Sequence, residues 1–160
     1  MYLDALSFLE DERDTWRPFE ALADLSDEQL ATRVDAAHGW SGRDLMGHLL
    51  SGLELSLAAA KELAVNETSR VFAGHDARWE AGGGDVVNPQ PLARYGALPL
   101  DELRARFRSV PGELRGYLTV VPESRWIKHP THQRSLLEET LEHYEEHADD
   151  LRAILEAAAR

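Results

Sequence analysis

Residues 39–57 read GWSGRDLMGHLLSGLELSL and predict the start and the buried face of a long helix. A Gly-Trp pair breaks the preceding chain, and the hydroxyl of Ser41 can accept hydrogen bonds from backbone N–H groups of the first helical turn. Leucine then recurs at every fourth residue from Leu45 to Leu57, which is typical of a helix face that packs in a bundle. We therefore expect a helix that begins near Ser41 and continues to about Ala64.

Similar patterns predict three more long helices. Apolar residues recur at helical spacing over residues 2–25, where Pro18 should kink or divide the helix, and again over residues 100–121. The last helix is expected to begin near Ser135 and to reach the C-terminus, because Ser135 and Glu138 match the capping-box pattern. A helix of about 20 residues is about 30 Å long, so four such helices can form a bundle. No segment shows a convincing strand pattern.

Residues 66–99 are the irregular part of the chain and connect the second long helix to the third. Glycines and prolines interrupt any regular pattern there, although residues 72–81 fit a short helix. A connection of this length inside a compact domain is usually functional or mobile, and its three aromatic residues are too many for a simple flexible linker. We expect it to pack over one end of a single all-α domain, a four-helix bundle that spans residues 1–160.

Composition and charge exclude several classes of function. The 160 residues include 17 Lys and Arg against 29 Asp and Glu, which gives a net charge of −12. This field repels phosphate backbones and anionic membrane surfaces, so neither nucleic acid nor a membrane is an expected partner. Cysteine is absent, which excludes disulfides, thiolate nucleophiles and cysteine-ligated metals. The first residues lack the positive charge of a signal peptide, so we expect a cytoplasmic protein.

Seven histidines are present, and three of them are candidates for a shared metal site. His143 and His147 are four residues apart, so both lie on one face of a helix and can reach the same ion. For this pair alone, partly exposed histidines beside carboxylates are as good an explanation as a metal. His48 lies next to the leucine stripe of the second helix, and a third interior imidazole favours a metal site with an open coordination position.

Together these motifs resemble the DinB-like (YfiT-like) superfamily of metal-binding four-helix bundles. Residues 39–49 resemble its GW(S/T)xxDLxxH motif at the start of the second helix, and residues 87–103 resemble its crossover into the third helix. The HxxxH spacing at the C-terminal helix resembles its second metal motif. The resemblance implies that His48, His143 and His147 bind a divalent ion, with zinc or nickel expected and iron as a further candidate.

The resemblance also implies two classes of function, because the superfamily includes mycothiol and bacillithiol S-transferases and the N-terminal domain of mycothiol-dependent maleylpyruvate isomerase. The first class is a metal-dependent S-transferase or hydrolase that activates a low-molecular-weight thiol, such as mycothiol, or water for attack on a small electrophilic substrate. The thiol would come from a cosubstrate because the chain has no cysteine. The second class is a non-catalytic bundle that binds metal or sequesters a small molecule. A homodimer stays open as the assembly state, and no further catalytic residue is assigned.

The remaining polar residues carry weaker functional predictions. A packed loop explains residues 75–79 of the crossover as well as a substrate mouth does. The acidic residues within 138–150 are expected to form a solvated helix face, and His129 and His132 are expected to lie on the solvated surface. His38, just before the second helix, is expected only to support the local turn.

Overall fold

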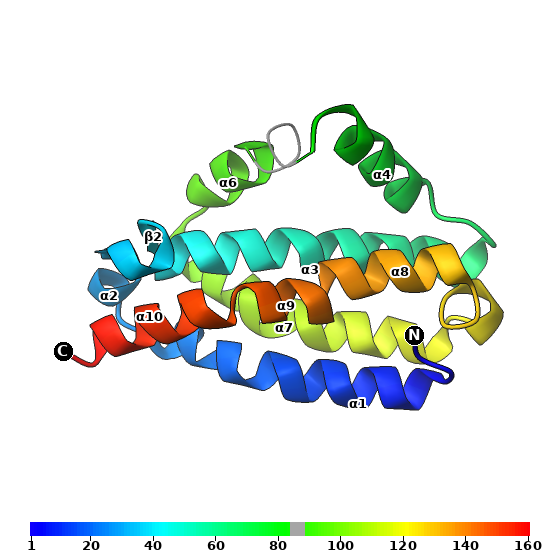
Figure 1. The fold of residues 1–160 in the computed structure, drawn as a ribbon, viewed down its shortest axis with the longest axis horizontal. Helices are drawn as coiled ribbons and strands as arrows, with labels where there is room; N and C mark the ends of the chain where they lie inside the picture. Colours follow the sequence, from blue (N-terminus) through cyan, green and yellow to red (C-terminus); the bar gives the residue numbers. More distant parts are fainter. Residues whose placement is uncertain (84–88) are drawn as a thin grey trace.

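Three long helices and a fourth, broken helical rod lie side by side in the computed structural model, which describes residues 1–83 and 89–160 (Figure 1). The long helices are α1 (Ala5–Trp16), α3 (Gly42–Val65) and α7 (Leu100–Val120), and the broken rod consists of α8 (Pro130–Glu139), α9 (Leu141–Glu146) and α10 (Ala148–Ala158). The expected all-α four-helix bundle is therefore confirmed. Residues 87–88 of the motif that resembles a family crossover lie outside the described residues.

The first rod is divided by Pro18, as the sequence predicts. Helix α1 ends at Trp16 and is followed by the 3-10 helix η1 (Arg17–Asp24), where Pro18 occupies the first turn. Backbone N–H groups in the first helical turn have no acceptor within the helix, so a proline at that position costs no hydrogen bond. Next comes α2 (Asp27–Ala31), which begins with a capping box between Ser26 and Gln29.

A short antiparallel pair, β1 (Arg33–Val34) and β2 (Trp40–Ser41), precedes α3, although the sequence analysis expected no strand. Two residues per strand are too few for an alternating pattern to be visible in the sequence. The connection contains the 3-10 helix η2 (Asp35–Ala37), and it turns back through His38 and Gly39, whose φ angles are 59° and 77°. This turn delivers the chain to the first residue of α3.

Helix α3 begins where the sequence predicts. The Ser41 hydroxyl accepts from the N–H of Asp44 at 3.2 Å, and the Asp44 carboxylate accepts from the N–H of Ser41 at 2.9 Å. Both halves of a capping box are thus formed. The leucines at 45, 49, 53 and 57 are all buried, so the stripe predicted from the sequence is the face that α3 turns to the core.

The core is one continuous cluster of apolar side chains drawn from all four rods. At its centre Trp16 contacts Phe107 and Tyr144, with ring centroids 4.9 and 5.0 Å from that of Trp16.

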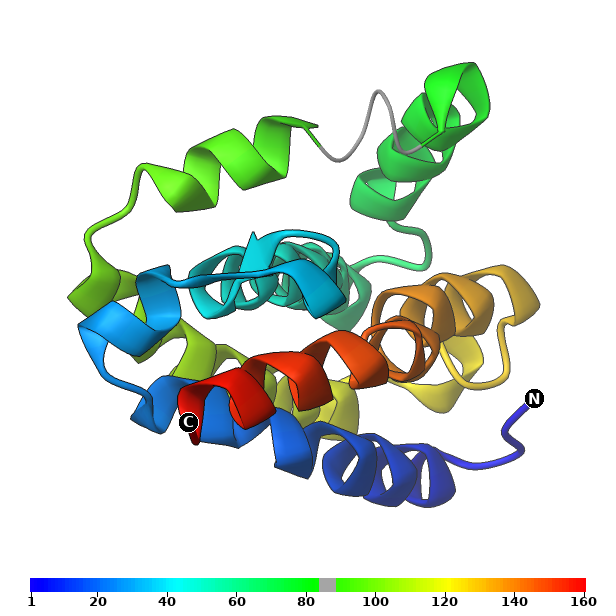
Figure 2. The same ribbon diagram turned by 60° about the vertical axis from the view of Figure 1, so that its left-hand side comes forward.

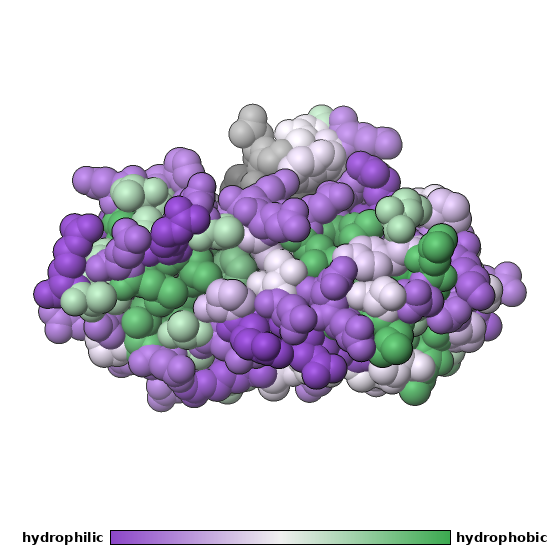
Figure 3. Space-filling model, turned by 60° about the horizontal axis from the view of Figure 1, so that its bottom comes forward, coloured by the Kyte–Doolittle hydropathy of each residue, from purple (hydrophilic) through white to green (hydrophobic). Residues whose placement is uncertain are grey.

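The outer surface on the side shown in Figure 3 is mainly hydrophilic in its middle and carries apolar side chains toward both ends. Within the described residues, no helix combines the length and apolar character that a bilayer span requires.

The crossover lies along α3 rather than over one end of the bundle, so that prediction is wrong. It contains α4 (Arg70–Gly82), which confirms the short helix expected at residues 72–81, and α6 (Pro89–Gly96). Figures 1 and 2 both show these two helices on the side of α3 that faces away from α1. The backbone of α6 approaches α3 closely at Gly47, because a Cβ there would be 2.8 Å from Cβ of Tyr95.

The fourth rod does not begin at Ser135, so the capping box predicted there is also wrong. After the 3-10 helix η3 (Glu123–Arg125), α8 starts at Pro130, with the ring of His129 accepting from the first turn. Proline favours the first helical position and starts the helix one turn earlier. The Ser135 hydroxyl instead donates to the carbonyl of Thr131 at 3.1 Å, as serines inside helices often do.

Candidate metal centre

His48, His143 and His147 converge on one point inside the bundle. His48 comes from α3, His143 from α9, and His147 is the residue that joins α9 to α10. The Nε2 atoms of His48 and His143 are 2.7 Å apart, and one ring nitrogen from each of the three residues lies within 4.8 Å of the others. The structure thus brings together the three residues that the sequence analysis selected.

Two breaks in the fourth rod set the directions of His143 and His147. Thr140 leaves the helical conformation with φ −123° and ψ −99°, and its hydroxyl donates to the carbonyl of Leu136 at 2.5 Å. A threonine that bonds back to the fourth preceding carbonyl tends to bend a helix. His147 has φ −103° and ψ 8°, a region of backbone space where many active-site residues are found. The rod can therefore change direction on both sides of α9.

Burial keeps two of the imidazoles in the neutral form that a metal requires. Desolvation, followed by the influence of His147, lowers the pKa of His48 to about 4. The pKa of His143 is lowered to about 3, again mainly by burial and then by His48 and His147. Both rings are therefore neutral at pH 7, with a lone pair available on one nitrogen. The facing Nε2 atoms suit an ion that accepts both lone pairs.

Asp150 supports the third imidazole. Its Oδ2 is 2.9 Å from Nδ1 of His147, and the aspartate is only 5% exposed. An ionised carboxylate can only accept, so Nδ1 of His147 carries the proton and Nε2 keeps its lone pair for a ligand. The expectation that Asp150 belongs to a solvated helix face is wrong. Its position three residues after His147 is the signal that could have identified it.

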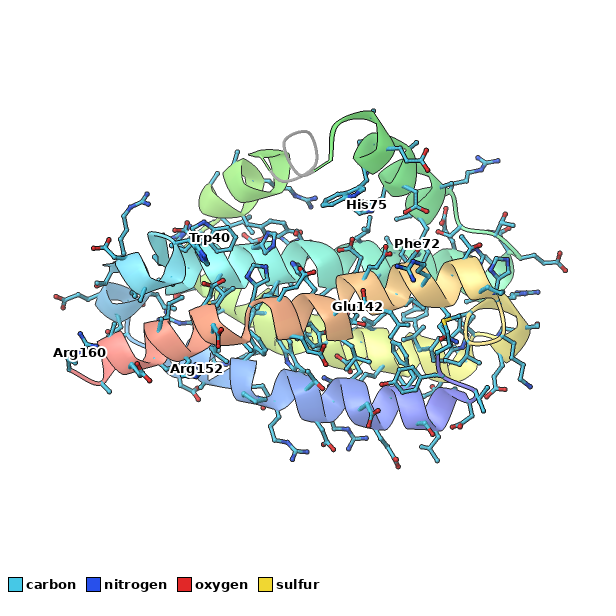
Figure 4. All side chains as sticks on the ribbon, in the orientation of Figure 1. Trp40, Phe72, His75, Glu142, Arg152 and Arg160 are labelled. Atoms are coloured by element: carbon cyan, nitrogen blue, oxygen red, sulfur yellow. The ribbon has the colours of Figure 1, made fainter. Side chains whose placement is uncertain are left out.

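Glu139 is the second acidic residue that the sequence analysis placed wrongly on the solvated face. Burial, and then the charges of nearby acidic side chains, raise the pKa of Glu139 to about 7. Its Oε1 is 3.4 Å from Nε2 of His75 in α4, and Figure 4 shows His75 on the side of α4 that faces the bundle. His75 is therefore turned inward, which fits a packed loop and a substrate mouth equally well, whereas the side chain of Trp79 is half exposed.

Gly52 allows Glu139 and His143 to approach α3. A Cβ at this position would be 2.8 Å from Oε2 of Glu139, 3.0 Å from its backbone oxygen and 3.1 Å from Nδ1 of His143. The same carbonyl of Glu139 lies near Nδ1 of His143, although no well-formed hydrogen bond joins them. Nδ1 of His48 is likewise buried without a partner in the described part of the chain. Of the three imidazoles, His147 alone has the supporting acceptor that a metal ligand normally has.

Aromatic and polar contacts complete the surroundings of the cluster. The indole of Trp40 stacks on His147 with ring centroids 5.6 Å apart, and it meets the ring of His48 edge-on at 5.0 Å. Trp40 lies beside the first turn of α3 in Figure 4. The other histidine pair is separate: His132 is buried, stacks on His129, and places Nδ1 2.7 Å from the carbonyl of Arg125. The prediction of a solvated His132 is wrong.

Comparison with known sequences identifies the family of the chain. The sequence model of one protein family, described as the mycothiol maleylpyruvate isomerase N-terminal domain, matches residues 9–152. That range contains all three converging histidines and Asp150. Comparisons with curated proteins and with solved structures gave no significant match. The chain belongs to the mycothiol maleylpyruvate isomerase N-terminal domain family, within the DinB/YfiT-like metal-binding helical superfamily.

Proposed function

We propose that His48, His143 and His147 bind a divalent metal ion, and that the protein is an enzyme which uses this ion to activate a small nucleophile. The observation that carries the proposal is the convergence of two buried imidazoles, His48 and His143, with the partly buried imidazole of His147, so that one ring nitrogen of each lies within 4.8 Å of the others. Imidazole ligands suit zinc, nickel and iron, so zinc or nickel is the proposed ion and iron is a further candidate.

The ligand number favours catalysis over a structural role. Structural zinc is normally closed by four protein ligands, whereas catalytic zinc keeps a position for water or substrate. Among residues 1–83 and 89–160, no fourth His, Asp or Glu joins the three histidines. Asp150 supports the same conclusion because it fixes the tautomer of His147, as carboxylates that accept from the second ring nitrogen of a metal-binding histidine do in many metalloenzymes.

The chemistry follows from the charge of the ion and from the composition of the chain. A divalent ion lowers the pKa of water or of a thiol that coordinates it, which provides a nucleophile at neutral pH. The protein has no cysteine, so a thiol must be a second substrate. The family match supports mycothiol as that thiol and a small electrophile as the other substrate. Trp40 covers one side of the His147 ring and limits the access of water there.

The decisive experiment combines metal analysis with an activity screen. Purified protein is stripped, reloaded with zinc, nickel or iron, and tested for consumption of mycothiol against a panel of electrophiles and for hydrolysis without thiol. Replacement of His147 by alanine should abolish metal retention and turnover, while circular dichroism shows an intact bundle. His129→Asn is the matched control, because it removes a histidine outside the cluster and keeps a side chain that can cap α8.

Three results would contradict the proposal. If wild-type protein retained no metal after reloading, the proposal would lose its basis. A His147→Ala variant that loses both metal and helical content would assign the ion a structural role. Protein that retains metal, binds a small molecule and shows no turnover would support the non-catalytic class, in which the bundle sequesters its ligand.

A further inference from the structure

His38 has a backbone conformation that is uncommon for residues other than glycine. Its φ of 59° and ψ of 26° lie in the left-handed region, and it is the one non-glycine residue with positive φ in the described ranges 1–83 and 89–160. Glycine adopts this conformation without a steric penalty, and asparagine tolerates it better than most residues. A histidine at such a position needs a compensating interaction, and strained residues of this kind often occur at functional sites.

The compensating interaction of His38 is a contact with Asp150. Nδ1 of His38 is 2.9 Å from Oδ1 of Asp150, while the other carboxylate oxygen is 2.9 Å from Nδ1 of His147. The side chain of His38 is 83% exposed and that of Asp150 is 7% exposed. The aspartate therefore lies between a solvent-exposed histidine and a candidate metal ligand, and each of its oxygens has its own imidazole partner.

We infer that His38 is a positioning residue for the metal centre, acting through Asp150 on the orientation of His147. The inference rests on the proposed function, since it concerns the same three-histidine site. An ionised carboxylate accepts from both Nδ1–H groups, so each hydrogen bond restricts rotation of the carboxylate about its last torsion. With both bonds present, Asp150 has one orientation, and His147 is held with Nε2 toward the other two histidines.

Loss of the His38 contact leaves one carboxylate oxygen free to exchange partners with water. The carboxylate can then rotate among several orientations, and only some of them keep the hydrogen bond to Nδ1 of His147. Residues that support a metal ligand typically change metal affinity by about 10- to 100-fold when removed, and this is the effect expected for Asp150→Ala. His38 is one hydrogen bond further from the ion, so a smaller effect of about fivefold is expected for its removal.

Two substitutions at position 38 separate the side-chain contact from the backbone strain. Glycine and asparagine both suit the left-handed conformation, but only asparagine places an N–H donor near the position of Nδ1 of histidine. We expect His38→Gly to weaken the affinity for zinc about fivefold and His38→Asn to keep it within about twofold of wild type, as measured by competition with a chromophoric chelator. His38→Asn should unfold at or above the wild-type temperature, because asparagine suits the left-handed conformation and keeps a donor for Asp150. In His38→Gly the relief of strain is offset by the lost contact and by the greater freedom of glycine in the unfolded chain, so its unfolding temperature should stay near or below that of wild type.

A merely structural role for His38 predicts a different pattern. Equal zinc affinity for His38→Gly and wild type, or equal weakening by glycine and asparagine, would overturn the inference. The double variant His38→Gly with Asp150→Ala should bind zinc no more weakly than Asp150→Ala alone, because His38 acts through Asp150. A further fivefold loss in the double variant would show that His38 acts by another route.

A metal-free measurement keeps this inference distinct from the proposed function. If wild-type protein binds no zinc, the proposed function fails, and the ¹⁵N chemical shifts of the imidazoles still test the positioning role. We expect His147 to occupy a single Nδ1–H tautomer in wild type and in His38→Asn, and a mixture of tautomers in His38→Gly. Identical His147 signals in all three proteins would overturn the inference.

Discussion

The hydroxyl of Tyr144 donates a hydrogen bond to Oε1 of Glu12 at 2.9 Å, and both residues are almost completely buried. Tyr144 belongs to α9, between two of the converging histidines, whereas Glu12 belongs to α1. Nε of Arg115 in α7 donates to the other carboxylate oxygen at 2.5 Å. Three rods are thereby joined through one buried carboxylate, and one of its donors directly follows His143 in the chain.

Replacing Tyr144 by phenylalanine should destabilise the fold by about 1–2 kcal/mol, because it leaves an oxygen of the buried Glu12 carboxylate without a donor. Urea unfolding followed by circular dichroism measures the change. The control is Tyr117→Phe, since Tyr117 is 37% exposed and should change the stability by less than about 0.5 kcal/mol. Equal effects at the two tyrosines would contradict a special contribution from the Glu12 contact.

Replacing Gly52 by alanine should destabilise the fold, although the same change usually stabilises a helix. In an exposed helix interior, alanine is favoured over glycine by about 1 kcal/mol. At position 52 the added methyl group would be 2.8 Å from Oε2 of Glu139 and 3.1 Å from Nδ1 of His143. We expect a lower unfolding temperature and weaker zinc binding.

The matched control for Gly52 is Gly116 in α7, where a Cβ would meet nothing within 4 Å. Gly116→Ala should raise the free energy of unfolding by about 1 kcal/mol and leave zinc binding unchanged. If Gly52→Ala also stabilised the protein, the close approach of Glu139 and His143 to α3 would be refuted.

The metal-free protein should lose stability on acidification because of His48. Its pKa is about 4 in the folded state and about 6.5 when unfolded, so the unfolded chain takes up a proton first as the pH falls. The contribution of neutral His48 to stability is fully present above about pH 6.5 and is lost as the pH falls from there to about pH 4. From pH 7 to pH 5, the unfolding free energy of wild type should therefore fall by about 1–2 kcal/mol more than that of His48→Gln.

Glu139 should give the opposite pH dependence. Its folded pKa of about 7 lies above the ordinary value of 4.5, so the folded protein binds the proton more tightly. That contribution to stability is fully present below about pH 4.5 and is lost as the pH rises through 7. In Glu139→Gln, the loss of stability from pH 5 to pH 7 should be smaller than in metal-free wild type. Parallel pH profiles for the two proteins would show that Glu139 is not desolvated.

The two capping-box motifs explain why the helix starts were only partly predictable. Ser41 and Ser135 have the same local pattern, but a helix cap also needs a non-helical backbone before it. The left-handed turn at Gly39 provides that break for Ser41. Pro130 has already started a helix before Ser135 is reached, so the second motif lies inside a helix. Which of two such motifs acts as the cap depends on the preceding turn, which a short pattern does not contain.

The candidate site was predictable in its histidines and not in its carboxylates. The spacing of His143 and His147, with His48 beside a leucine stripe, indicates a shared interior position. Asp150 and Glu139 were assigned to the solvent because the whole acidic run within 138–150 was interpreted as one solvated helix face. Glu139, four residues before His143, and Asp150, three residues after His147, share the histidine face even of a straight helix. Their burial depends on the close approach of α3 and on the contact with His38, which the local spacing does not contain.

The crossover has a consequence for how this scaffold can diversify. The converging histidines come from α3 and from the broken rod, whereas α4 and α6 lie along α3, and α4 approaches the cluster through the contact of His75 with Glu139. Insertions, deletions or exchanges within residues 66–99 can therefore reshape the approach to the cluster while the histidine-bearing helices keep their packing. We therefore expect selectivity for a ligand to depend mainly on the crossover, and retention of the ion to depend on the helices that carry the three histidines.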